Sequence, residues 1–90
     1  MGKCEFDEIE ALVNKAISAQ NREIANEFIN KLDLMKRTLN LQPYTTIVFC
    51  ELLSSVKAAS GQVKEKERKL YTVNQCLNKL KPLIEEQEEQ

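Results

Sequence analysis

The fold is decided by residues 49–84, which read FCELLSSVKAASGQVKEKERKLYTVNQCLNKLKPLI. If Phe49 is position a of a heptad, every later a position is apolar, and Lys66 is the single polar d position. Apolar residues that alternate at spacings of three and four are typical of a helix packed along a narrow stripe. We call these positions the seam: Phe49, Leu52, Val56, Ala59, Val63, Lys66, Leu70, Val73, Leu77, Leu80 and Ile84.

The seam keeps its register through Ser60 and Gly61. A glycine inside a helix costs about 1 kcal/mol relative to alanine, which burial of such a stripe can offset. A chain that turned at Gly61 would have no need to keep the register. The pattern therefore favours one continuous helix over residues 44–81, with a turn at Gly61 as the alternative. Because Pro82 lacks a backbone N–H, we expect the helix to end or kink just before it.

Residues 5–40, which precede the seam, are also predicted to be helical. Acidic residues begin this segment, and Lys36 and Arg37 end it, which suits the helix dipole at both ends. The polar residues Ser18, Gln20 and Asn21 interrupt its apolar stripe, so a break or kink near residue 20 is the alternative to one continuous helix. Pro43 marks the turn that follows and suits the first position of a new helix.

The predicted fold class is all-α, an antiparallel hairpin of two long helices at about residues 5–40 and 44–81. Each helix would have about 36 residues and a length of about 54 Å. A lone hairpin leaves flanking apolar residues exposed, so we expect two hairpins to assemble into a four-helix-bundle dimer. If both helices break, near residues 20 and 61, the same residues would form a compact three- or four-helix bundle within one chain.

Composition and charge narrow the class of protein. The chain has 90 residues, a net charge of −1 and 42% hydrophobic residues, which suits one small globular domain. We expect residues 1–84 to form a single helical domain and residues 85–90 an acidic, frayed tail, because acids oppose the dipole at a helix C-terminus. No apolar run is long enough to span a membrane, so a cytoplasmic protein is predicted. The Met1 start favours a complete small protein.

The residue types that usually carry catalysis or bind metals are scarce. The chain has no histidine, and its cysteines, Cys4, Cys50 and Cys76, are widely spaced with no Cys-x-x-Cys pair. It also lacks a glycine-rich phosphate loop. We therefore predict no enzyme, no catalytic residues, no cofactor and no metal, with thiols that are buried or idle.

The leading functional prediction is a non-enzymatic interaction or regulatory module that self-associates, most simply as a homodimer, and binds a partner protein. Lys66 is the exception in the seam. It could reach solvent, pair across a subunit interface or set the oligomeric state. The residues predicted to form the oligomer interface are Phe49, Leu52, Val56, Val63, Lys66, Leu70, Val73, Leu77 and Leu80.

A second prediction, of a different class, is a small helical binder of RNA or of a nucleotide-like anionic ligand. Lys57, Lys64, Arg68 and Lys69 would contact its phosphates. Interleaved acids favour an ordinary solvated helix face instead, so nucleic acid or a nucleotide is the less favoured partner. At the start of the second long helix, capping by Thr45 or Gln42 is likewise favoured over an anion site.

Overall fold

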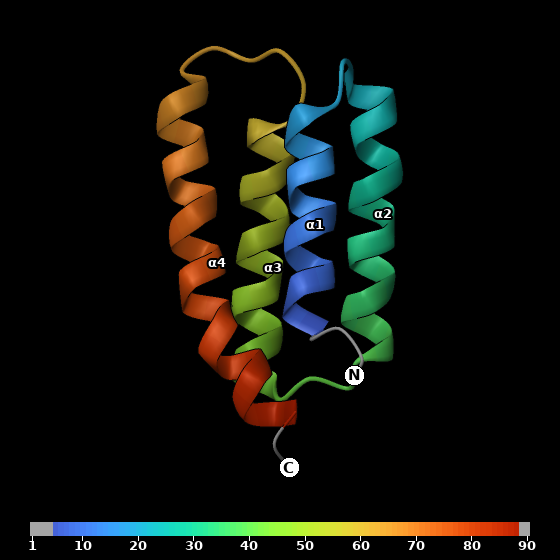
Figure 1. Cartoon of the computed structure of the whole chain (residues 1–90), viewed down its shortest axis with the longest axis vertical. Coiled ribbons are helices and arrows are strands. Elements are labelled where there is room, and N and C mark those ends of the chain that lie inside the picture. The colour runs from blue at the N-terminus through green and yellow to red at the C-terminus, as the bar shows by residue number, and fades with distance from the viewer. Residues whose placement is uncertain (1–4, 89–90) are drawn as a thin grey trace.

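The structure is a computed structural model that describes the backbone of residues 5–88. These residues contain no strand and form four helices that run alternately up and down (Figure 1). The bundle measures 40 × 23 × 21 Å. Within it, α1 packs mainly against α2 and α3 mainly against α4, whereas α2 and α4 lie at opposite corners. The helices are α1 (Glu5–Ser18), α2 (Arg22–Thr38), α3 (Pro43–Ala59) and α4 (Lys66–Glu88).

The all-helical class is confirmed, but the prediction of two long continuous helices is wrong. The chain leaves helical geometry at residues 19–21 and again at residues 60–65. A continuous helix over residues 44–81 would be about 57 Å long. The longest dimension of the molecule is 40 Å. The four helices agree with the alternative prediction of a compact bundle with breaks near residues 20 and 61.

The helix α3 ends where two residues in succession abandon the helical conformation. Ser60 is extended, with φ −79° and ψ 149°, and Gly61 has φ +73°. A positive φ is open to glycine at little cost, because glycine has no Cβ. Gly61 also lies against the α1–α2 turn, since a Cβ added to it would be 3.8 Å from the backbone nitrogen of Arg22. The loop therefore folds back onto the α1–α2 turn and ends the helix.

The helices α2 and α3 begin differently. The side chain of Asn21 accepts a hydrogen bond of 2.9 Å from the backbone N–H of Ile24, which caps α2. The N-cap residue of α3, Gln42, makes no hydrogen bond with its side chain, and Thr45 is buried. The expected capping by Thr45 or Gln42 is therefore wrong. The hydroxyl of Thr46 instead donates to the carbonyl of Gln42 at 3.0 Å.

Prolines occupy the first turn of α3 and the later part of α4. Pro43 is the first residue of α3, as predicted. Pro82 does not end α4, which continues to Glu88 and bends in its lower part (Figure 1). Proline removes one backbone donor and bends a helix without necessarily stopping it. Residues 85–88, assigned to a frayed tail from the sequence, are the end of α4, and residues 89–90 lie outside the described part of the chain.

All four helices contribute to one apolar core. Its composition is mostly aliphatic, as the sequence requires, with Phe49 as its largest fully buried side chain. Burial of such side chains is the main favourable contribution to folding. The largest fully buried residues are Ile9, Val13, Leu32, Val48, Phe49, Leu52, Val56, Val73, Leu80 and Ile84.

Candidate functional site

Most seam residues lie in the core of a single chain. Because α3 and α4 pack antiparallel and α1 and α2 complete the bundle, the apolar stripe is covered without a second copy. The buried members of the seam are therefore already covered within one chain. Of the predicted interface residues, Val63 and Leu70 are half-buried. Those that are buried are Phe49, Leu52, Val56, Val73, Leu77 and Leu80.

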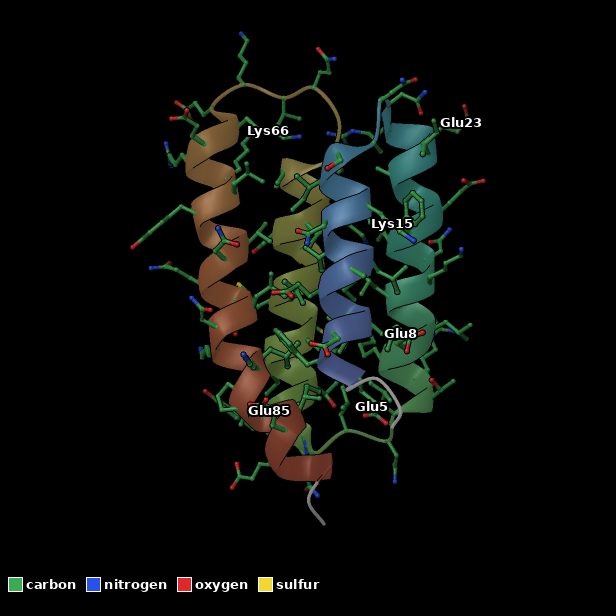
Figure 2. The ribbon with its side chains drawn as sticks, in the orientation of Figure 1. Glu5, Glu8, Lys15, Glu23, Lys66 and Glu85 are labelled. Carbon is green, nitrogen blue, oxygen red and sulfur yellow. The ribbon has the colours of Figure 1, made fainter. Side chains whose placement is uncertain are left out.

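Lys66, the polar exception in the seam, joins the α3–α4 loop to the end of α1 (Figure 2). Its ammonium group donates hydrogen bonds to the carbonyl oxygen of Ile17 at 3.0 Å and to that of Gly61 at 2.6 Å. The last carbonyls of a helix lack partners within the helix and carry the negative end of its dipole. Lys66 therefore binds the end of α1 within one chain, which accounts for a charge at a seam position.

The four basic residues predicted to contact an anionic ligand do not line one common pocket. Lys64 borders a hollow of about 610 Å³ at the loop end of the bundle. Lys69 borders a different hollow, between α3 and α4. Arg68 pairs with Glu65 at 3.1 Å. Lys57 lines neither hollow. Neither hollow brings these four residues together, so an anionic ligand at this position stays a prediction.

The outward side of α3 carries few charges. Its 17 residues include one acid and one base, fewer than in any other helix of the described chain. We define the α3 outer face as the exposed residues that repeat here at spacings of three and four: Tyr44, Ile47, Glu51, Ser54 and Ala58. Tyr44 is 55% exposed and Ile47 57%. This face thus presents two large apolar side chains to solvent on a nearly uncharged surface.

A hollow of about 270 Å³ lies beside the C-terminal half of the α3 outer face. Ser54, Ser55 and Ala58 line it from α3, and Lys69 and Thr72 line it from α4. Small side chains leave this space between the two helices, because larger side chains would fill it. The face therefore has protruding side chains at one end and a hollow at the other.

The helix α4 borders the same face. The sulfur of Cys76 lies 3.5 Å from the hydroxyl oxygen of Ser55, and Nζ of Lys79 lies 6.0 Å from the centre of the Tyr44 ring. Lys79 follows Cys76 by nearly one helical turn on an antiparallel helix. Lys79 is therefore placed along α3 between Ser55 and Tyr44, at about the level of Glu51.

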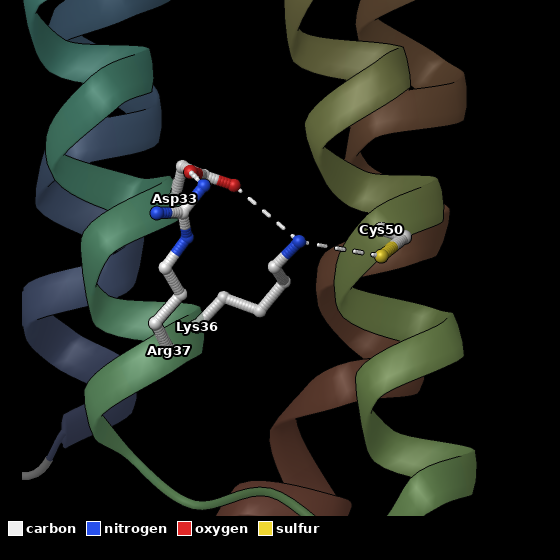
Figure 3. Close-up of polar contacts among 4 residues, drawn as sticks. All are labelled: Asp33, Lys36, Arg37 and Cys50. Carbon is white, nitrogen blue, oxygen red and sulfur yellow. Dashed lines mark hydrogen bonds and ion pairs between the residues drawn. The ribbon is translucent and has the colours of Figure 1, made fainter.

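The opposite edge of α3 is bound to α2 (Figure 3). Nζ of Lys36 lies 3.3 Å from a carboxylate oxygen of Asp33 and 3.8 Å from the sulfur of Cys50. Arg37 pairs with the other carboxylate oxygen of Asp33 at 3.1 Å. The charges of α2 at this edge are thus engaged with one another and with α3.

Three other kinds of feature could indicate function in residues 5–88: metal ligands, thiols and membrane-spanning helices. No three acidic or cysteine side chains in this range gather where they could hold a metal ion. Of the thiols predicted to be buried or idle, Cys50 is exposed and Cys76 is half-buried, while Cys4 lies outside the described residues. No helix in the described part of the chain is long and apolar enough to cross a membrane.

No protein-family model matches the chain, and neither does any curated protein or solved structure. The candidate site is therefore argued from its geometry. Apolar periodicity misses the α3 outer face, because Tyr44 and Ile47 lie outside the seam. The sequence does carry a weaker signal, since residues 43–59 include one acid and one base over almost five helical turns.

Proposed function

We propose that this chain is a non-enzymatic interaction module that self-associates, and binds partner proteins, through the α3 outer face. The observation that supports this is the exposure of Tyr44 and Ile47 side by side on the least charged helix. Complete burial of an isoleucine side chain contributes about 1.5–3 kcal/mol. Exposed apolar patches with polar surroundings are typical of protein–protein contact sites, and tyrosine is enriched in them.

Leu34 and Tyr71 do not form such a patch, because neither has a second exposed apolar residue one turn away on its own helix. Leu34 is 60% exposed on α2, but Lys31 and Thr38 are its neighbours one turn away on the same helix. Tyr71 is exposed on α4 next to Arg68 and Gln75. Single apolar residues scattered over a charged surface are normal in globular proteins and indicate no binding site.

The substitution Ile47→Lys tests the proposal. We expect the wild-type chain to form dimers at tens of micromolar in sedimentation equilibrium. The variant should dissociate at least about tenfold more readily, a change of about 1.4 kcal/mol. The physical reason is that the interface would lose the burial of the isoleucine side chain and would have to remove an ammonium group from water.

The matched control is Leu34→Lys, which adds the same charge at a comparably exposed aliphatic residue of α2. We expect this variant to dimerise like the wild-type chain, because its surroundings are already charged. Equal weakening by both substitutions would contradict the assignment to α3. A wild-type chain that stays monomeric throughout the concentration range would contradict self-association itself.

A further inference from the structure

The side chains of the α3 outer face are large at its N-terminal end and small at its C-terminal end. Tyr44 and Ile47 protrude into solvent at the first end. At the other end, Ser54 and Ala58 border the hollow of about 270 Å³. The volume of the hollow exceeds that of an aromatic ring, and serine and threonine hydroxyls in its lining can accept a hydrogen bond from a phenol group. The α3 outer face thus carries both protruding side chains and a hollow that such a side chain could fill.

The spacing of these residues is nearly symmetric about Glu51. Tyr44 precedes Glu51 by seven residues and Ala58 follows it by seven, while Ile47 precedes it by four and Ser54 follows it by three. Tyr44 and Ala58 therefore each lie about 10 Å from Glu51 along the helix. If two α3 helices lay antiparallel across a two-fold axis at Glu51, Tyr44 of each copy would face Ala58 of the other. Ile47 would likewise face Ser54, and each contact would occur twice.

The charges near Glu51 suit the same arrangement. Two Glu51 carboxylates at the axis would repel each other. Lys79 lies at the level of Glu51 in each copy, between its contact with Tyr44 and the Cys76–Ser55 contact. The two-fold axis would therefore bring two acids and two bases together, with Glu51 of each copy near Lys79 of the other. Exposed ion pairs contribute little to stability. Their role here is to offset the repulsion and to favour one direction of packing.

From the protrusion, the recess and these charges, we infer that the occupant of the α3 outer face is a second copy of the chain, docked with its α3 antiparallel. Tyr44 of each copy enters the hollow beside Ala58 of the other. This inference rests on the proposed function and names the partner for the same face. A parallel arrangement would instead place Tyr44 against Tyr44 and leave both hollows unfilled.

Disulfide trapping tests this arrangement. The substitution Glu51→Cys, in a chain whose own cysteines Cys4, Cys50 and Cys76 are replaced by serine, places two thiols at the axis. A disulfide requires Cα atoms within about 7 Å of each other. Ala58→Cys in the same background is the matched control, because its two copies would be about 20 Å apart along antiparallel helices.

We expect Glu51→Cys to form covalent dimers under mild oxidation at least an order of magnitude faster than Ala58→Cys. Both positions are exposed, and circular dichroism with sedimentation of the reduced proteins verifies that the fold and the association persist. Equal trapping of the two variants would overturn antiparallel docking. Failure to trap either variant would overturn it as well, but would leave self-association standing if the wild-type chain dimerises. A monomeric wild-type chain would overturn both and leave a different protein as the occupant of the face.

Discussion

The neighbouring helices α2 and α3 have the same length, 17 residues each, and both bury one side in the same core. Their outward sides differ. The helix α2 carries seven charged residues, whereas α3 carries Glu51 and Lys57. The inward side of a helix determines how it packs, and it is mostly apolar in both helices, although α3 buries more residues than α2. The exposed residues of a helix are less constrained by folding than its buried ones. The difference between the exposed sides of α2 and α3 is therefore where we look for a binding surface.

Three of the charged residues of α2 pair with one another. Asp33 pairs with Lys36 and Arg37 at spacings of three and four residues. Such pairs contribute about 0.2–0.5 kcal/mol each and keep a helix face solvated. The exposed Tyr44 and Ile47 of α3 gain nothing comparable from water. Burial by another protein would stabilise them, which is why the proposed interface lies on α3.

The largest expected effect tests whether the inward sides of the two helices are equivalent. Phe49 on α3 and Leu32 on α2 are both fully buried. We expect Phe49→Ala to lower the free energy of unfolding by about 3–5 kcal/mol and Leu32→Ala by about 2–5 kcal/mol, through lost burial and the cavity left behind. Urea unfolding followed by circular dichroism measures both.

The control for these core substitutions is Asn30→Ala on the exposed side of α2, which should change the free energy of unfolding by no more than about 0.5 kcal/mol. If Phe49→Ala lowered the free energy of unfolding as little as the control does, the two helices would not be equivalent on their inward sides. It would mean that α3 is not a core helix of the isolated chain and that its inward side serves an interface after all.

The turn before α3 and the apolar stripes could be predicted from the sequence, because Pro43 and the spacing of buried residues have local causes. The end of α3 could not. Only Val63 and Lys66 carry the seam across the loop, and neither is fully buried. Ala59 and Val73 face the same core from two different helices. A register that crosses a loop by chance cannot be distinguished from a register that a continuous helix imposes.

The candidate site could be predicted even less fully. Periodicity shows that Leu52 and Leu77 must be covered, but it does not show whether the covering helix belongs to the same chain. The seam was therefore assigned to an oligomer interface, although α1 and α2 complete its covering. Tyr44 and Ile47 lie outside the seam, and the role proposed for them depends on the hollow between α3 and α4. That hollow has no counterpart in the sequence.

The loop that follows α3 provides a further test of how the two helices differ. Lys66, the first residue of α4, donates to the carbonyl of Gly61 in this loop and to that of Ile17 at the end of α1, so we expect Lys66→Met to lower the free energy of unfolding by about 1–2 kcal/mol. This is towards the lower end of the range for hydrogen bonds from a charged donor, because water reaches the half-buried site. Thermal unfolding provides the measurement. The control is Lys64→Met, at an exposed position of the α3–α4 loop. Equal stability of the two variants would refute the role given to Lys66.

The smallest expected effect concerns how α2 and α3 begin. The side chain of Asn21 caps α2 through the N–H of Ile24, so Asn21→Ala should cost about 1 kcal/mol. Gln42 makes no such bond at the start of α3, so Gln42→Ala should change the free energy of unfolding by less than about 0.5 kcal/mol. Chemical denaturation of the two variants beside the wild-type chain measures the difference. If Gln42→Ala cost as much as Asn21→Ala, the start of α3 would depend on a side-chain cap after all. The contrast between the two helices would then be confined to their outward sides.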